Sequence, residues 1–573
     1  MPRPSAQPPQ TSPDPLDRTA RRMLAQATGG LAPSVLVGAW VDWALQLAAS
    51  PGRQAQLAEH AMRNALLLAG RGGTAALDPA LMRDRRFASP LWDQPPYDRL
   101  RDAFLLTDDW WQETTRSLRG LSPRSAAQLR FAMRQALDAV APANFPHLNP
   151  EVLERARQTG GLSLLRGMQN IWDGVLRPEH GEGVADPDFV IGETLAATPG
   201  KVVLRTHLME LIQYAPSTGA VHPEPILIVP AWIMKYYILD LSSYNSLVRW
   251  LVAQGFSVFM ISWRNPGAED AGLGMAEYLE QGPRAALDAV QAITGAERVH
   301  SAGYCLGGTL LTILAADLAR RGDDRLASIT LLAAQVDFSE PGELGLFISE
   351  AQVALIEDLM AEKGYLDGMQ MAGAFTLLRS KELFWSRFVR EAMLGERDEP
   401  SDLMYWNADA TRMPFRMHSE YLRGLYLDNA LASGSYRVDG EALSLSDIRA
   451  PVLAVGTESD HVAPWRSVWK IHHLTKGDVA FILTSGGHNA GIVSEPGHPR
   501  RRFRIETTRS NQHPGDPQEW LERAQPRQGS WWPAWSAWLK DRSRSPVAPP
   551  PMGNSDAGLP SLDDAPGTYV RQR

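Results

Sequence analysis

The sequence predicts an α/β fold, a largely parallel sheet covered by helices, preceded by an all-helical region. Two observations lead to this prediction. After about residue 189, short apolar runs rich in β-branched residues alternate with helical segments, as is typical of parallel sheets buried on both faces. Before that point, apolar residues recur at three- and four-residue steps, which indicates helices that each bury one face.

Six apolar runs are expected to form the buried strands of the sheet. They are residues 225–230, 257–263, 298–304, 328–334, 451–456 and 479–484. The interval between the fourth and fifth runs is much longer than an ordinary crossover connection and contains helical patterns of its own. It is therefore interpreted as an inserted cap at about residues 337–444.

Composition predicts the remaining organisation of the chain. Six of the first fifteen residues are proline, which indicates a disordered tail over 1–30, followed by a helical N-terminal domain over 31–188. The catalytic α/β domain is expected to span 189–542, and a segment rich in Pro, Gly, Ser and Asp predicts a flexible tail over 543–573. Tryptophans at helical spacing, namely Trp531, Trp535 and Trp538, are expected to face the core.

Charge and cysteine content argue against several classes of protein. Lys and Arg total 57 against 65 Asp and Glu, so a dedicated nucleic-acid-binding protein is not expected. One cysteine cannot form an intramolecular disulfide and suits a reducing compartment. No apolar run is long enough for a transmembrane helix, and the N-terminal residues do not resemble a secretory signal, so a cytoplasmic protein is expected. His472 and His473 lack further ligands at metal-binding spacing, so neither a metal nor another cofactor is expected.

The single cysteine, Cys305, lies in the sequence GYCLGG, directly after the run 298–304 and before the helical pattern TLLTILAADLA. Strand, G-x-C-x-G turn and helix together form the pattern of a nucleophile elbow, the strained turn that presents the nucleophile in the α/β-hydrolase fold. The N-terminus of the following helix favours the thiolate form of a cysteine. The sequence therefore predicts an α/β-hydrolase fold with an inserted cap and Cys305 as its nucleophile.

In this fold the acid and the histidine follow the nucleophile along the chain, each after a later strand. Asp460 comes just after the run 451–456, and His488 lies on a glycine-rich loop after the run 479–484. His488 is expected to take the thiol proton, and Asp460 to orient the imidazole. Asp337 is an alternative acid, one strand earlier, and His461 is an alternative base beside Asp460.

Two backbone N–H groups are expected to form an oxyanion hole. One belongs to Leu306, the residue after the nucleophile. The other is expected in the loop AWIMKYY, which follows the run 225–230, with Ile233 preferred over its neighbour Trp232.

Several long motifs resemble the polyhydroxyalkanoate synthases. They are VPAWIMKYYILDLSSYNSLVRWLVAQGFSVFMISWRNP, GYCLGG, WNADATRMPFRMHSEYLRGLYLDNAL, SDHVAPW and SGGHNAG, with further similarity from about Leu77 to the closing PGTYV. Tyr304 beside the nucleophile and the single long chain are similar to the class I branch of this family. Met234, where the family commonly has Asn, and AGIVSEPGHPRR after the histidine are departures that bear on substrate preference.

The resemblance implies polymerisation of (R)-3-hydroxyacyl-CoA thioesters into a polyester with release of CoA. It also implies a homodimer that begins in the cytoplasm and associates with the growing polyester chain at the granule surface. A cysteine suits this chemistry because it accepts the acyl group as another thioester, which stays activated for attack by a hydroxyl. Asp460 then acts either on that hydroxyl directly or through His488.

Two other functions are compatible with parts of the sequence. An intracellular thioesterase or polyester depolymerase would use the same Cys305, His488 and Asp460, with water as the acyl acceptor. A non-catalytic granule-coating protein would use tryptophan-rich surfaces, but such a protein has no need of the three residues in catalytic order.

Overall fold

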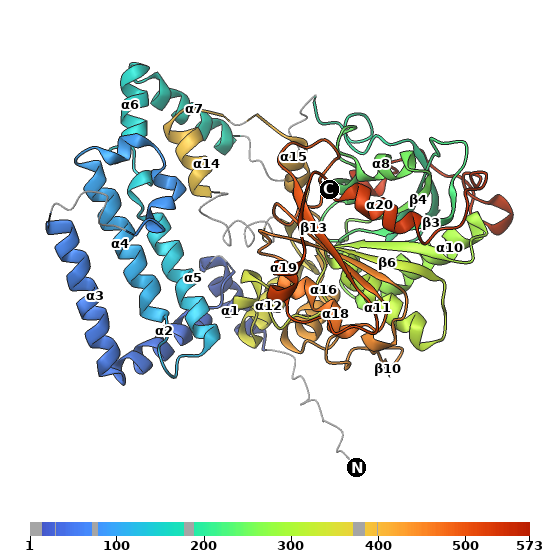
Figure 1. Cartoon of the computed structure of the whole chain (residues 1–573), viewed down its shortest axis with the longest axis horizontal. Helices are drawn as coiled ribbons and strands as arrows, with labels where there is room; N and C mark the ends of the chain where they lie inside the picture. Colours follow the sequence, from blue (N-terminus) through green and yellow to red (C-terminus); the bar gives the residue numbers. More distant parts are fainter. Residues whose placement is uncertain are drawn as a thin grey trace, which may run out of the picture.

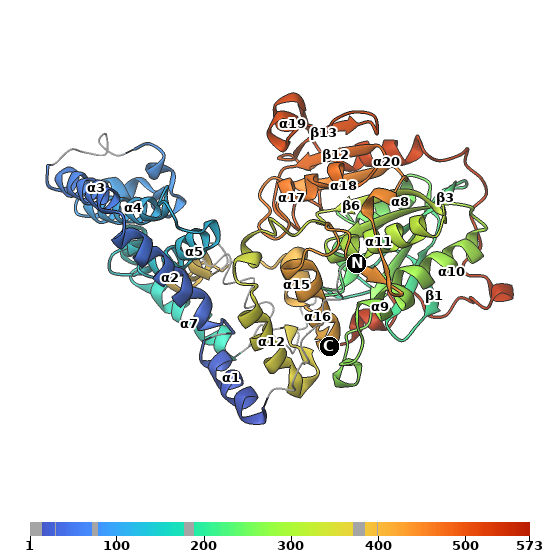
Figure 2. The ribbon, with the colours of Figure 1, turned by 90° about the horizontal axis from the view of Figure 1, so that it is seen from below.

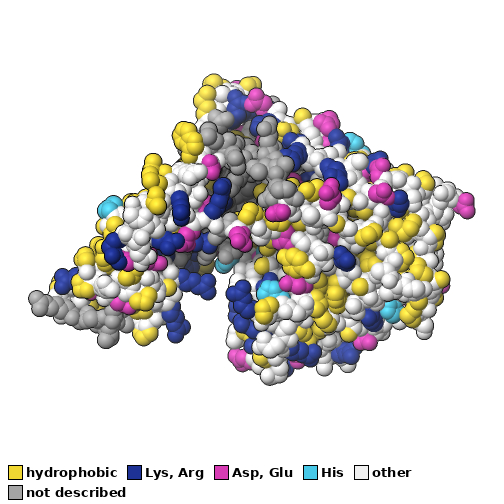
Figure 3. Space-filling model, turned by 90° about the horizontal axis from the view of Figure 1, so that it is seen from above, with side chains coloured by type: hydrophobic (Ala, Val, Ile, Leu, Met, Phe, Trp, Pro, Cys, Tyr) yellow, Lys and Arg dark blue, Asp and Glu magenta, His cyan; other side chains and the backbone are white. Residues whose placement is uncertain are grey.

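The structure is a computed structural model that describes residues 14–28, 30–70, 78–176, 188–368, 370, 384–397 and 399–573. The N-terminal helices lie to one side of a larger α/β body (Figure 1). Seen from above, a notch separates these two parts, and Lys and Arg side chains lie on both sides of it (Figure 3). Within the described residues, no helix is both long and apolar enough to cross a membrane.

The body is built on a ten-stranded sheet of order β1-β2-β4-β3-β5-β6-β11-β12-β13-β14. Its strands are β1 (Gly200–Arg205), β2 (Met209–Tyr214), β3 (His222–Val229), β4 (Phe256–Trp263), β5 (Val299–Tyr304), β6 (Leu326–Leu332), β11 (Val452–Thr457), β12 (Val479–Thr484), β13 (Arg502–Thr508) and β14 (Pro526–Gln528). The six strands from β4 to β12 in this order pair in parallel, whereas β1, β2, β13 and β14 pair antiparallel at the two edges. The parallel strands are the six that the sequence predicts.

Helices cover both faces of the sheet, as the apolar strands require (Figures 1 and 2). They are α8 (Leu247–Ala253), α9 (Met275–Leu279), α10 (Ala285–Thr294), α11 (Leu306–Arg320), α17 (Trp465–Trp469), α18 (Ile471–Leu474), α19 (Pro517–Arg523) and α20 (Trp532–Lys540). One core cluster includes residues of α9, α10 and α11, and the other includes residues of α8 and α20. Trp531, Trp535 and Trp538 are buried, as expected from their spacing.

Seven helices are described in the N-terminal region: α1 (Pro15–Ala27), α2 (Pro33–Ala48), α3 (Pro51–Ala69), α4 (Tyr97–Thr115), α5 (Pro123–Ala139), α6 (Pro150–Gln158) and α7 (Leu162–Leu176). Most of them begin at a proline, which tolerates the first helical position because its missing N–H has no partner there. Helix α1 differs from the disordered tail expected over 1–30. Its N-cap is Asp14, whose side chain accepts a hydrogen bond from Leu16, while residues 1–13 lie outside the described residues.

The region expected to be a cap, residues 337–444, contains short helices between β6 and β11. Its described elements include η9 (Glu343–Leu346), α12 (Glu350–Lys363), β7 (Tyr365–Leu366), α14 (Ser386–Phe388), η11 (Val389–Met393), α15 (Asp402–Ala408), β8 (Met413–Pro414), α16 (Phe415–Tyr421), η12 (Leu422–Leu427), β9 (Arg437–Val438) and β10 (Glu441–Ala442). It contacts the N-terminal helices, because α1 packs on α12 and α7 packs on η11 (Figures 1 and 2).

The C-terminal segment, residues 547–573, differs from the flexible tail that its composition predicts. We call this segment the strap. Val547 pairs with Val221 before β3, and the N–H groups of Thr568 and Tyr569 donate hydrogen bonds to the buried carboxylate of Glu210 in β2. The strap contains two short 3-10 helices, η14 (Ser555–Ala557) and η15 (Tyr569–Arg571), and contacts with the body supply further hydrogen bonds to its backbone.

Candidate functional site

Cys305 lies in a sharp turn between β5 and α11. Its backbone has φ of 53° and ψ of −125°, and its N–H donates to the carbonyl of Leu332 at 2.9 Å. A positive φ is strained for a residue with a side chain, and such strain is typical of the nucleophile elbow. The thiol is partly buried and contacts both core clusters. The predicted nucleophile therefore occupies the geometry that the G-x-C-x-G pattern indicates.

Glycines beside Cys305 are required by close packing. A Cβ added at Gly307 would lie 2.1 Å from the carbonyl oxygen of Val229, the last residue of β3. A Cβ added at Gly303 would lie 2.3 Å from the Cα of Gly308. These separations are far below van der Waals contact, so the elbow has room for glycine alone at both positions.

Asp460 and His488 come from the loops after β11 and β12 and form a hydrogen-bonded pair. His488 Nδ1 lies 2.8 Å from Asp460 Oδ2. Thr457 donates its hydroxyl to the same oxygen at 2.9 Å. The N–H groups of Val462 and Ala463 donate to Asp460 Oδ1, each at 2.8 Å. All these contacts fix the carboxylate, which in turn orients the imidazole, and the His488 side chain also interacts with Cys305.

The pKa values of this pair are displaced in opposite directions. Burial lowers the pKa of His488, but the charges of Asp460 and Cys305 outweigh burial and raise that pKa well above 6.5. Burial likewise raises the pKa of Asp460, but the charge of His488 and the hydrogen bonds to the carboxylate lower it below 3.8. Both shifts favour a charged imidazolium paired with the Asp460 carboxylate.

Aromatic side chains support the histidine loop. The ring centroids of Tyr304 and His488 are 5.7 Å apart, and the Tyr304 hydroxyl donates to Asn489 Oδ1 at 2.6 Å. The indoles of Trp531 and Trp532 donate to the carbonyls of Gly491 and Ile492 respectively, each at 3.0 Å. The tryptophans at the start of α20 thus hold the backbone that follows His488.

The alternative acid Asp337 and the alternative base His461 make other contacts in the structure. Asp337 Oδ1 accepts hydrogen bonds from the backbone and hydroxyl of Ser339 and from Asn429 at 3.1 Å, so this carboxylate stabilises the start of the cap. His461 contributes its carbonyl to the N–H of Glu343 at 3.3 Å. His472 lies in α18, where its Nδ1 contacts the carbonyl of Trp469 at 2.7 Å.

The loop proposed to carry the second oxyanion donor follows β3 and is fixed by the cap. The carbonyl of Ile233 accepts from the N–H of Thr411 at 3.2 Å, and that of Trp232 accepts from the Thr411 hydroxyl at 2.6 Å. Leu306 is the first residue of α11, so its N–H has no intrahelical partner. The end of β3 lies against this helix at Gly307, which places the Ile233 loop beside the start of α11.

Two tyrosines of the cap lie near the Cys305 thiol, and the sequence did not predict this. Burial raises the pKa values of Tyr421 and Tyr426 above 10.0, and the charge of Cys305 contributes to both shifts. Their hydroxyls are 3.3 Å apart. No local motif marks either residue, because their proximity to Cys305 depends on how α16 and η12 fold back over the sheet. Among the described residues, no group of three or more His, Cys, Asp or Glu could hold a metal ion.

Comparisons with known proteins place this geometry in a family. Residues 83–251 match the model described as poly-beta-hydroxybutyrate polymerase (PhaC) N-terminus, and residues 11–53 match the one described as poly-beta-hydroxybutyrate polymerase N terminal. Residues 224–494 match the alpha/beta hydrolase fold, which confirms the predicted fold class. Among solved structures, the Paleococcus ferrophilus monoacylglycerol lipase is similar over 58% of this chain and 99% of that chain, with 14% identity and a TM-score of 0.32.

Curated relatives extend the match over most of the chain. A poly(3-hydroxyalkanoate) polymerase of Methylorubrum extorquens is 41% identical over 86% of this chain and 81% of its own length. The polymerase subunit of Rhizobium meliloti is 38% identical, over 87% of this chain and 82% of its own. That of Cupriavidus necator is 35% identical over 86% and 84% respectively. With the α/β-hydrolase fold and the motifs already described, these matches mean that the chain is an acyltransferase belonging to the poly(3-hydroxyalkanoate) polymerase family.

Proposed function

We propose that this enzyme polymerises (R)-3-hydroxyacyl-CoA thioesters into a polyester by covalent catalysis on Cys305, with release of CoA. The observation that carries the proposal is the hydrogen-bonded Asp460–His488 pair beside a cysteine at a nucleophile elbow. Membership of the polymerase family supports the class of substrate.

The first step transfers an acyl group to the enzyme. The Cys305 sulfur attacks the thioester carbonyl, forming a new S–C bond, and the bond to the CoA sulfur breaks. His488 takes the thiol proton and gives it to the departing CoA thiolate. The N–H groups of Leu306 and Ile233 stabilise the oxyanion of the tetrahedral intermediate.

The second step forms the ester bond. The 3-hydroxyl of another hydroxyacyl-CoA attacks the acyl carbonyl, the new C–O bond forms, and the S–C bond to Cys305 breaks. His488 carries the hydroxyl proton to the cysteine sulfur, and Asp460 acts by orienting His488. The product is a longer acyl-CoA that can acylate Cys305 again, so chain growth needs no external energy source.

A polymerase must keep water from the acyl-enzyme. The apolar neighbours of Cys305 in both core clusters and the buried Tyr421 of the cap support this requirement. The exclusion of water strengthens electrostatic interactions in the site and leaves a hydroxyl of the substrate as the acceptor.

Acyl transfer and polymer formation test the proposal together. Purified wild-type enzyme and the Cys305→Ala variant are incubated with 3-hydroxybutyryl-CoA, and free thiol and polyester are measured in parallel. We expect both products from the wild type and neither from the variant. Thiol release without polymer would identify a thioesterase, and equal activity of the two proteins would disprove catalysis by Cys305.

We also propose that the enzyme associates with the surface of its growing product. The N-terminal helices support this, because apolar side chains on α2 and α3, among them Val41, Leu45 and Met62, are exposed. The cytoplasmic location and the homodimer implied by the resemblance stay predictions.

A further inference from the structure

The loop that carries Ile233 is held from two sides, of which the cap supplies one. Besides the contacts of Thr411, the indole of Trp406 donates to the carbonyl of Lys235 at 2.7 Å. The indole of Trp232 contacts the sulfur of Met417 at 3.1 Å. The cap thus fixes the loop through the backbone carbonyls of Trp232, Ile233 and Lys235.

The strap supplies the other side. The ammonium group of Lys235, two residues after Ile233, donates to the carbonyl of Gln572 at 2.5 Å and to that of Tyr569 at 3.4 Å. Lys235 is only 3% exposed, and burial lowers its pKa to about 8. A buried amine needs polar partners, so these two carbonyls, together with the nearby charge of Asp409, hold the Lys235 side chain in place.

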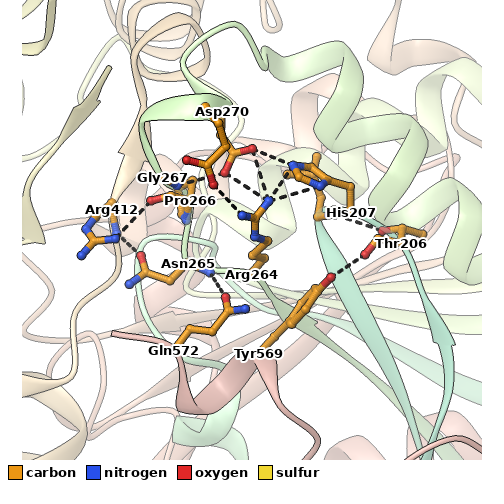
Figure 4. A network of polar contacts seen from close by, with 12 residues as sticks. Thr206, His207, Arg264, Asn265, Pro266, Gly267, Asp270, Arg412, Tyr569 and Gln572 are labelled. Carbon is orange, nitrogen blue, oxygen red and sulfur yellow. Dashed lines mark hydrogen bonds and ion pairs between the residues drawn. The ribbon is translucent and has the colours of Figure 1, made fainter. Parts of the chain in front are cut away.

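Gln572 links the strap back to the cap. Its Oε1 accepts from the N–H of Asn265 at 3.1 Å, and Asn265 Oδ1 accepts from the N–H of Arg412 at 2.9 Å (Figure 4). Arg412 follows Thr411, which bonds the Ile233 carbonyl. A closed ring of contacts therefore runs from the loop through the strap, the turn after β4 and the cap, and returns to the loop.

The strap is anchored firmly enough to act as a fixed support. Glu210 in β2 is fully buried, and its carboxylate accepts from the N–H groups of Thr568 and Tyr569 at 2.9 Å and from Arg205 at 2.5 to 2.8 Å. The Tyr569 hydroxyl donates to the carbonyl of Thr206 at 2.9 Å (Figure 4). Charge-assisted bonds of this kind resist displacement.

We propose that the strap positions the Ile233 loop, with Lys235 and Gln572 as positioning residues for acyl transfer to Cys305. This inference rests on the proposed function. Neither residue is assigned contact with the substrate. Their effect passes through the backbone of the Ile233 loop, where a displacement of about 1 Å can lower a rate by about 100-fold.

Two reactions of Cys305 distinguish a displaced Ile233 loop from a general loss of structure in the site. Transfer of an acyl group from 3-hydroxybutyryl-CoA develops an oxyanion, which needs the loop. Alkylation by iodoacetamide forms an S–C bond and expels iodide without an oxyanion, so it reports only on the thiolate and His488. Because Cys305 is the only cysteine, both rates can be assigned to it without further substitutions.

We compare Lys235→Met and Gln572→Leu with the wild type. Both are expected to lower kcat for thiol release by about 10- to 100-fold with KM changed less than about threefold. Their alkylation rates are expected to stay within about twofold of the wild type. Gln572→Glu keeps an acceptor for the Asn265 N–H and should restore most of the activity that Gln572→Leu loses. Gln572→Leu carries the test if Lys235→Met fails to fold.

Matched controls are Lys476→Met and Gln525→Leu, which alter exposed residues elsewhere on the body and should leave both rates unchanged. Unchanged acyl transfer in Gln572→Leu, or an equal fall of acyl transfer and alkylation, would overturn the positioning role. Absence of thiol release from the wild type would instead count against the proposed function, so the two failures are distinguishable.

Discussion

Strand β4 and helix α3 bury their side chains to very different extents. All eight residues of β4 are buried, whereas α3 has 19 residues and only Leu57 is buried. The strand belongs to the body that carries the elbow, and the helix belongs to the N-terminal region with its exposed apolar side chains. The difference shows that the side chains of β4 are held by neighbours on every side, whereas most side chains of α3 remain at the surface.

The largest expected effect comes from adding one methyl group to each region. Gly307→Ala forces a Cβ to within 2.1 Å of the Val229 carbonyl oxygen, so we expect about 3 kcal/mol of destabilisation and loss of acyl transfer. In Gly38→Ala, on α2, the added Cβ would have no heavy atom within 4 Å. This change should stabilise the folded protein by roughly 0.5 to 1 kcal/mol, because alanine has the higher helix propensity. Urea unfolding and thiol release measure both. Equal tolerance of the two changes would contradict the comparison.

The next effect concerns His488. His488→Gln removes the proposed base, so it should lower acyl transfer by about 100- to 10,000-fold and should slow alkylation of Cys305 at neutral pH. The native pKa of His488 is raised above 6.5, so its contribution to stability is fully present below about pH 6.5 and is lost as pH rises through the native pKa. Urea unfolding of wild type and variant at pH 6 and at alkaline pH should therefore give a difference that shrinks with pH. A difference that grows with pH would show that the sign of this shift is wrong.

The sequence predicted the strands that are buried on both faces and the site residues whose order along the chain is set by the fold. The six parallel strands read as apolar runs because helices cover both faces, whereas β13, with RFRIETT at an antiparallel edge, gives a mixed pattern. Asp460 and His488 could be predicted because the fold fixes their order after Cys305, and the structure places them within hydrogen-bonding distance of each other. Their catalytic roles stay predictions.

The features that could not be predicted from the sequence depend on contacts between residues far apart in the chain. The Pro and Gly content of the strap predicts a flexible segment. That composition gives no information about Glu210, 358 positions away, which accepts a hydrogen bond from the N–H of Thr568. Tyr421 and Tyr426 of the cap likewise approach Cys305 only after the chain has folded back. Composition describes local preferences, and these contacts outweigh them.

A smaller effect is expected from the loss of a single hydrogen bond to the carboxylate of Asp460. Thr457→Val removes the 2.9 Å donor to Asp460 Oδ2 but keeps the shape of the side chain. We expect a loss of about 1 to 2 kcal/mol in stability and a fall in kcat of about five- to tenfold, since Asp460 keeps its two backbone donors. The control is Thr107→Val on the exposed face of α4, which should change stability by less than about 0.5 kcal/mol. Activity equal to the wild type in Thr457→Val would mean that this hydroxyl does not help to orient His488.

The smallest effect on chemistry is expected on α2. Val41 and Leu45 are 52% and 64% exposed and lie four residues apart, on one face of the helix. Changing both to Asp should leave thiol release from soluble 3-hydroxybutyryl-CoA within about twofold, and stability within roughly 1 kcal/mol, since each exposed site contributes little. Adsorption to polyester particles, measured by sedimentation, should fall because apolar contact area is lost. Unchanged adsorption together with reduced thiol release would contradict this expectation, because it would mean that α2 contributes to acyl transfer and not to binding of the polyester.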